Sequence, residues 1–117
     1  MNFDDAIKAH SDWKMKLRTA IMAKAKLDAT TIARDDNCIL GKWLHGESAA
    51  TYGKLLCFGD CKRLHAAFHQ EASKVAAVIN AGKYAQAETM LGSGTPYATA
   101  SNAVVGAITA LKREARL

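Results

Sequence analysis

Apolar residues near the start of the chain recur with the period of an α-helix. An α-helix brings residues three, four and seven positions apart onto one face. Residues 2–27 carry such a stripe, and a histidine falls within it. The stripe consists of Phe3, Ile7, His10, Leu17 and Ile21. The pattern predicts a long helix that ends at about Leu27, with His10 facing the core of a helical bundle and Trp13 beside it, one turn further along.

The periodicity breaks at "ATTIARDDN", and a short helix is predicted to follow this segment. Asp35, Asp36 or Asn37 is suited to cap that helix, because short polar side chains accept hydrogen bonds from the first free backbone N–H groups. The helix itself would be "CILGKWLHG", with Cys38 in or near its first turn. The next segments, "GESAATYG" and "CFGD", are typical of loops around a short irregular piece.

A second long helix is predicted over about residues 61–80. Asp60 is a suitable N-cap, and Ala81 and Gly82 end the helix. Its apolar face carries Leu64, Phe68, Val75, Val78 and Ile79. An adjoining stripe begins with His65 and His69 and continues through Ala72, Ala76 and Ile79. Both histidines are therefore predicted to lie along the border of the apolar face.

The last part of the chain is predicted to form a third long helix. A short helix, "YAQAETML", comes first, and "GSGTP" then interrupts the chain before Thr95 caps and Pro96 opens the last helix. The apolar residues that repeat at bundle spacing in this helix are Tyr97, Val104, Ile108 and Leu111. We therefore expect a single all-α domain over residues 1–117, a four-helix bundle with additional short helices.

Composition agrees with this fold class and narrows the possible functions. Half of the 117 residues are apolar, with abundant Ala, Leu and Lys, as in helical proteins. The formal net charge of +5 is scattered along the chain and is not interleaved with aromatic residues, so we expect solvated helix faces and no nucleic-acid partner. No apolar run approaches the ~20 residues that span a bilayer, and the first residues are acidic. We therefore expect a cytoplasmic domain without membrane insertion.

The three cysteines, Cys38, Cys57 and Cys61, cannot all pair within one chain. An odd number without a secretory segment indicates reduced thiols in a reducing compartment. Such a thiol serves as a small buried residue, a metal ligand or a redox-reactive group. Cys57 and Cys61 lie four residues apart, but nothing else supports a site there, and we expect both to be small buried or half-buried residues.

The segment "HAAFH" places His65 and His69 four residues apart. Two histidines at this spacing project from one face of a helix, close enough to bind the same ion. Taken alone, the spacing is weak evidence for a metal. Ala66 also stands where the glutamate of the His-Glu-x-x-His zinc-protease motif would be.

Two further residues strengthen the case for a metal site. His10 lies on the core stripe of the first helix, where an unpaired imidazole is costly to bury. Cys38 lies at the start of a short helix, whose positive end favours a thiolate. Three imidazoles and one thiolate complete a tetrahedral zinc site, and this mixture of sulfur and imidazole favours zinc, or competing copper, over magnesium or calcium.

Three ordered motifs resemble those of a known family. They are "HSDWK" at residues 10–14, "CILGKW" at residues 38–43 and "HAAFH" at residues 65–69. This order is similar to the His-x-x-Trp-Lys/Arg, Cys-x-Leu-Gly-x-Trp and His-x-x-x-His pattern of the chemoreceptor zinc-binding domain. The resemblance covers essentially the whole chain and implies that Zn²⁺ is bound by His10, Cys38, His65 and His69.

The resemblance also carries expectations about function. It implies a non-catalytic regulatory domain of bacterial signal transduction, commonly a homodimer, that acts with chemoreceptor signalling regions or diguanylate cyclase domains. Some members are linked to sensing hypochlorous acid, so Cys38 is also a candidate redox switch. We expect Trp13 and Trp43 to exclude water from the metal, and we do not expect His45 to touch it.

Two other classes of function remain as alternatives. A catalytic zinc site keeps a coordination position open for water or substrate, whereas four protein ligands would close it, and no general base is evident. A di-iron, hemerythrin-like bundle that binds oxygen also uses His-x-x-x-His on a helix. That site needs bridging carboxylates, yet Lys14 is the residue four positions after His10. The di-iron bundle is the runner-up.

Overall fold

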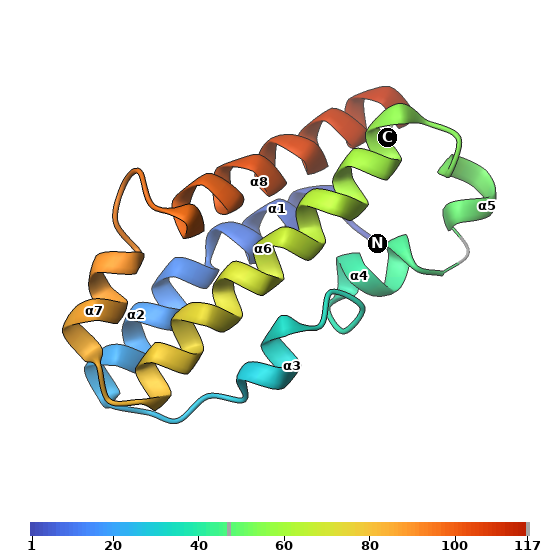
Figure 1. The fold of residues 1–117 in the computed structure, drawn as a ribbon. Helices are drawn as coiled ribbons and strands as arrows, with labels where there is room; N and C mark the ends of the chain where they lie inside the picture. The colour runs from blue at the N-terminus through green and yellow to red at the C-terminus, as the bar shows by residue number, and fades with distance from the viewer. Residues whose placement is uncertain (47, 117) are drawn as a thin grey trace.

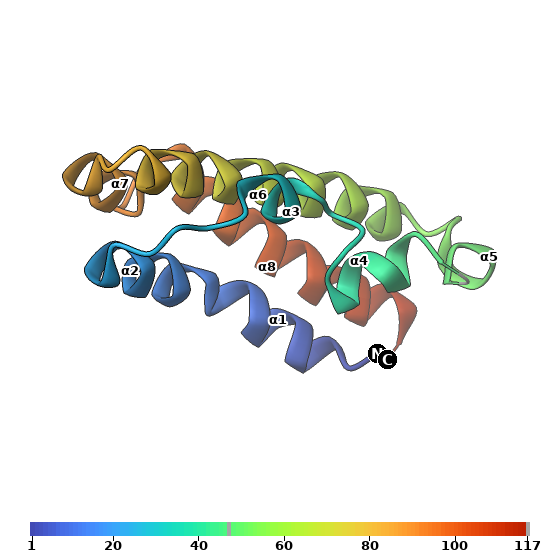
Figure 2. The same ribbon diagram turned by 90° about the horizontal axis from the view of Figure 1, so that it is seen from below.

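The computed structural model describes residues 1–46 and 48–116, and within these ranges it contains helices and loops but no strand. The helices are α1 (Phe3–Ser11), α2 (Trp13–Ala23), α3 (Ala29–Ala33), α4 (Ile39–Leu44), α5 (Ser48–Tyr52), α6 (Leu56–Asn80), α7 (Tyr84–Met90) and α8 (Pro96–Ala115). Three long rods, formed by α1 with α2, by α6 and by α8, run side by side (Figure 1). Helices α3 and α4 cover the fourth side, so the predicted all-α bundle with additional short helices is confirmed (Figure 2).

The first rod is interrupted and ends earlier than predicted. Asp12 separates α1 from α2, and α2 stops at Lys24, which adopts a left-handed conformation with φ of 52°. The chain then crosses the end of α6, where Asn80 bonds both backbone groups of Leu27: Leu27 N–H donates to Asn80 Oδ1 at 2.7 Å, and Asn80 Nδ2 donates to the Leu27 carbonyl at 2.7 Å. These bonds hold residues 25–28 outside the helix.

Helix α6 begins at Leu56, earlier than the predicted start at Cys61. Asp60 is therefore inside the helix, and its predicted role as N-cap is wrong, as is the predicted loop at "CFGD". The first turn is capped from another helix. Glu114 of α8 accepts from Cys57 N–H at 3.1 Å and from the Cys57 thiol at 3.3 Å. A carboxylate at a helix N-terminus stabilises the free N–H groups and the helix dipole.

The fourth side of the bundle contains a helix that periodicity did not predict. Helix α3 lies within the "ATTIARDDN" break, and Asp28 caps it by accepting from Thr31 N–H at 3.1 Å. The cap of α4 is Cys38 itself, whose Sγ accepts from Gly41 N–H at 3.3 Å. The prediction that Asp35, Asp36 or Asn37 caps this helix is therefore wrong.

The remaining elements agree with the prediction. Helix α7 follows α6, and Thr95 caps α8 by accepting from Ala98 N–H at 3.2 Å, with Pro96 as the first helical residue. The core lies between the three rods, and its fully buried side chains include Leu17, Phe68, Val104, Ile108 and Leu111. No helix in the described part of the chain is long and apolar enough to cross a membrane.

Candidate metal centre

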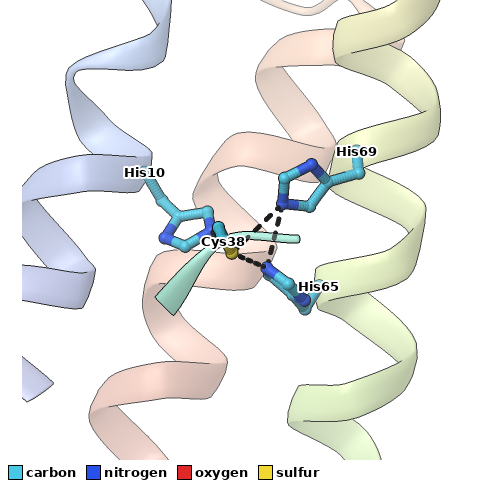
Figure 3. Close-up of side chains that lie close together, drawn as sticks. All are labelled: His10, Cys38, His65 and His69. Carbon is cyan, nitrogen blue, oxygen red and sulfur yellow. Dashed lines mark hydrogen bonds between the residues drawn. The ribbon is translucent and has the colours of Figure 1, made fainter. Parts of the chain in front are cut away.

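Four potential metal ligands from three separate segments meet at one point of the bundle. His10 comes from α1, Cys38 from the start of α4, and His65 and His69 from α6 (Figure 3). One ligand atom from each residue lies within 4.8 Å of all the others. The structure therefore brings together all four residues that the sequence nominated, although they span most of the first 69 positions.

The histidines occupy the interior face of their helices. His65 and His69 are one turn apart on α6, and their Nε2 atoms are 3.0 Å from each other. The His10 ring meets the His65 ring edge-on, with centroids 4.9 Å apart. His10, His65 and His69 are 2%, 0% and 3% exposed, respectively. Three imidazoles are thus withdrawn from water almost completely.

Cys38 completes the group from the opposite side. Its Sγ is 3.2 Å from His65 Nε2, 3.7 Å from His69 Nε2 and 3.9 Å from His10 Nε2. The loop that carries Cys38 folds tightly onto α4 at Gly41. A Cβ atom at Gly41 would lie 1.8 Å from the carbonyl oxygen of Asp35, so this position of α4 requires glycine. Gly41 thus allows the Asp35 backbone to approach α4 closely.

Backbone carbonyls orient two of the rings. His10 Nδ1 is 2.7 Å from the Ala6 carbonyl and His69 Nδ1 is 2.9 Å from the Ile32 carbonyl, so each Nδ1 carries the proton it donates. This assignment leaves each Nε2 with a lone pair directed at the centre, as metal-binding histidines require. His65 Nδ1 is buried without a hydrogen-bond partner among the described residues. The Ile32 carbonyl belongs to α3, and the sequence pattern had given no reason to look there.

Burial sets the protonation of the four groups. It lowers the pKa of His10 and His69, and it lowers the pKa of His65 to about 3, so the imidazoles are neutral at pH 7. Burial also raises the pKa of the Cys38 thiol, against the opposite effect of the Gly41 and Leu40 N–H groups. The expected thiolate at the helix end is therefore not favoured by the protein alone. A bound cation would supply the missing charge.

The geometry fits a zinc ion. Tetrahedral Zn²⁺ with Zn–N of about 2.0–2.1 Å and Zn–S of about 2.3 Å needs ligand atoms about 3.3 Å apart for two nitrogens and about 3.6 Å apart for nitrogen and sulfur. The distance between His65 and His69 Nε2 is 3.0 Å, and the sulfur–nitrogen distances run from 3.2 to 3.9 Å. The four ligand atoms lie within 4.8 Å of one another, so the widest pair would have to close by up to about 1.5 Å (4.8 less 3.3 Å) to reach these values.

Carboxylates do not belong to this group. The cluster formed by the described residues contains three histidines and a cysteine, with no Asp or Glu. A di-iron centre needs bridging carboxylates, so nothing here favours the hemerythrin-like alternative. The nearby Asp35 instead pairs with His45, whose Nε2 is 3.0 Å from Asp35 Oδ2. His45 lies outside the cluster, as predicted.

Aromatic rings surround the histidines. Phe68 packs edge-on against both His10 and His69, with centroid distances of 5.5 and 5.6 Å, a contact that the sequence reasoning missed. Trp13 lies 6.5 Å from the His69 ring. Trp43 packs 5.2 Å from Phe3, away from the imidazoles, so it supports α4 and does not cover the ligands directly.

The other cysteines also lie outside the centre. Cys57 is half-buried and is bonded to Glu114, whereas Cys61 is fully buried in the core. Burial raises the pKa of Cys61 to about 12, which makes it an inert thiol. Both are therefore the small buried or half-buried residues that the sequence predicted.

Comparison with known proteins gives one finding. A family model described as the chemoreceptor zinc-binding domain matches residues 10–76. The matched range starts at His10 and contains Cys38, His65 and His69. No curated protein and no solved structure gave a significant match.

Proposed function

Because the chain belongs to the chemoreceptor zinc-binding domain family, we propose that it is a non-catalytic regulatory module that binds one Zn²⁺ through His10, Cys38, His65 and His69. The observation that carries this proposal is the convergence of four metal-ligating atoms, three of them on nearly fully buried rings. Four protein ligands leave no open coordination position for a substrate, which is the arrangement of structural and regulatory zinc sites.

The residues of the site come from three different segments of the chain, and a shared metal ion would link these segments. His10 fixes α1, Cys38 fixes the start of α4, and His65 with His69 fixes α6. When bound, zinc supplies coordination free energy that favours the arrangement in which these three segments are close together. The carbonyls of Ala6 and Ile32 hold two rings in the required orientation, so α1 and α3 also respond to occupancy.

We extend the proposal to the signalling role that the family supports. The domain acts as a homodimer in the bacterial cytoplasm and passes its zinc-dependent state to a signalling output domain or to chemotaxis proteins, as in chemoreceptors or diguanylate cyclases. The resemblance of the three motifs supports this role. A domain that stays monomeric in solution, or an output that does not change with zinc, would contradict it.

A second regulatory input acts through Cys38. Three ligands are nearly fully buried, whereas Cys38 is half-buried and therefore the ligand most open to reagents. Hypochlorous acid would oxidise its thiolate to the sulfenic acid and be reduced to chloride, and the site would lose its sulfur ligand. Dilute oxidant should modify Cys38 and release zinc, and Cys57→Ser, which keeps all four ligands, should respond like the wild type. Zinc retained alongside an unmodified Cys38 would rule this input out.

Metal analysis tests the zinc proposal directly. Protein purified without added zinc should contain roughly one zinc per chain, because a four-ligand site of this type binds tightly. His65→Ala and His69→Ala should lose the metal, whereas His45→Ala should keep it because His45 pairs with Asp35 outside the cluster. Absence of zinc from the wild-type protein would overturn the proposal.

A further inference from the structure

A cavity of about 500 Å³ lies beside the metal centre, between α1 and the start of α4. Its wall is largely apolar and includes Ala9, Trp13, Ile39 and Leu40. Two of the metal-ligating residues, His10 and Cys38, also line it, whereas His65 and His69 do not. The cavity therefore meets one edge of the four-ligand group and leaves the other edge covered.

Burial separates Cys38 from the three histidines. His10, His65 and His69 are 2%, 0% and 3% exposed, whereas Cys38 is half-buried. Access from solvent is thus possible at Cys38, without moving α6. A volume of about 500 Å³ is in the range that admits a small molecule.

The outer part of the cavity offers both signs of charge. Asp5 and Lys16, both exposed, are among the lining residues, and the Lys16 ammonium lies 5.0 Å from the centre of the Trp13 ring. At this outer part of the cavity Asp5 attracts a cation, and Lys16 attracts a small metal-binding molecule that carries a negative charge or a polar acceptor.

We infer that this cavity is the route by which zinc and small metal-binding molecules reach and leave the site. This inference rests on the proposed zinc-binding function and adds the side of the bundle from which zinc reaches its ligands. A preformed route makes exchange possible while the bundle stays folded. Without it, the metal would exchange only when α1 or α4 separates from α6.

Two substitutions alter the cavity without touching a ligand. Ala9 is exposed and lines the cavity from α1, so Ala9→Trp fills it. Ile39 is 74% exposed at the start of α4, so Ile39→Ala widens it. Ala85→Trp places the same indole on an exposed position of α7, away from the cavity, and is the matched control.

Zinc-loaded protein is mixed with excess pyridylazo-resorcinol, and the rate of zinc transfer to the dye is followed by absorbance. Ala9→Trp should slow transfer by on the order of tenfold, because it occupies a pocket of small-molecule size. Ile39→Ala should accelerate transfer, and Ala85→Trp should match the wild type. Zinc content before mixing, measured by metal analysis, should be the same for all four proteins.

The outcomes separate the two proposals. If the wild-type protein holds no zinc, the proposed function fails. If zinc is bound but Ala9→Trp releases it at the wild-type rate, exchange proceeds through opening of the bundle and the inference is wrong. If Ala9→Trp does not retain zinc at equilibrium, the test rests on Ile39→Ala. Zinc transfer from Ile39→Ala that is no faster than from the wild type then overturns the inference.

Discussion

Gly41 is the residue on which the position of Cys38 depends most directly. The Asp35 carbonyl oxygen occupies the space that a Cβ would take, and that contact folds the loop so that the Cys38 sulfur faces the histidines. Gly41→Ala should therefore displace this loop and cost on the order of 2 kcal/mol or more of unfolding free energy, as overpacking does. Urea unfolding and zinc titration measure the two effects, and zinc affinity should fall together with stability.

Gly106 provides the matched control for this substitution. A Cβ at Gly106 of α8 would meet nothing within 4 Å. Gly106→Ala should thus stabilise the helix by roughly 0.5–1 kcal/mol and leave zinc affinity unchanged. An equal response of both variants would show that Gly41 has no special role.

The buried histidines make the metal-free protein sensitive to acid. Burial holds the pKa of His65 at about 3 and also lowers the pKa of His10 and His69, from an ordinary value of 6.5. Below about pH 6.5 the unfolded chain takes up protons on these rings while the folded chain does not. The free energy of unfolding should therefore be highest above pH 6.5 and should fall as the pH drops toward 3, by at most about 1.4 kcal/mol per pH unit for each ring.

Urea titrations of chelator-treated protein at pH 7.5, 6 and 5 measure this loss. His65→Gln removes one titrating ring and should show a shallower decline over the same range. A stability that stays constant between pH 7.5 and 5 would contradict the assigned neutral state of the rings.

At the scale of the elements, the sequence predicted those helix boundaries that are determined by residues close to them in the chain. Helix α8 was placed correctly because Thr95 and Pro96 define its start within three residues of sequence. The start of α6 was misplaced because its capping carboxylate, Glu114, lies 57 residues away. Helix α3 is five residues long and too short for a period to be visible. The sequence could nominate the four residues of the cluster because His65 and His69 share a helical spacing and because three ordered motifs resemble those of a known family. The Ile32 carbonyl that orients His69 lies 37 residues away in the sequence and depends on tertiary structure.

The Glu114 cap leads to a prediction about α6. Glu114→Ala leaves the Cys57 N–H without its acceptor and should cost about 0.5–2 kcal/mol, the usual effect of losing an N-cap. Hydrogen exchange should accelerate at the first turn of α6. Arg113→Ala, at the exposed neighbouring position, is the control and should change neither. Unchanged exchange at Cys57 in Glu114→Ala would show that this carboxylate does not cap the helix.

At the scale of the whole molecule, the bundle combines two kinds of connection. Helices α6 and α8 pack through a core in which Phe68, Val104, Ile108 and Leu111 are fully buried, and burial of such side chains is stabilising without any metal. The segment 34–44 forms a cover over one side of the bundle (Figure 2). It packs Leu40 and Leu44, which are 1% and 0% exposed, into the core, and it also carries Cys38. The metal centre would thus add a second attachment between the core and this short cover.

Removal of zinc should therefore loosen the molecule unevenly. A ligand present at a thousandfold excess over its dissociation constant adds about 4 kcal/mol to stability, so chelation should lower the melting temperature measurably. Amide exchange should rise most in residues 34–44, where Cys38 would lose its partners, and least in the contact between α6 and α8. Exchange mass spectrometry of zinc-loaded and chelated protein distinguishes this pattern from a uniform increase. A uniform increase would mean that zinc stabilises the bundle as one unit, and the cover would then have no separate response to transmit.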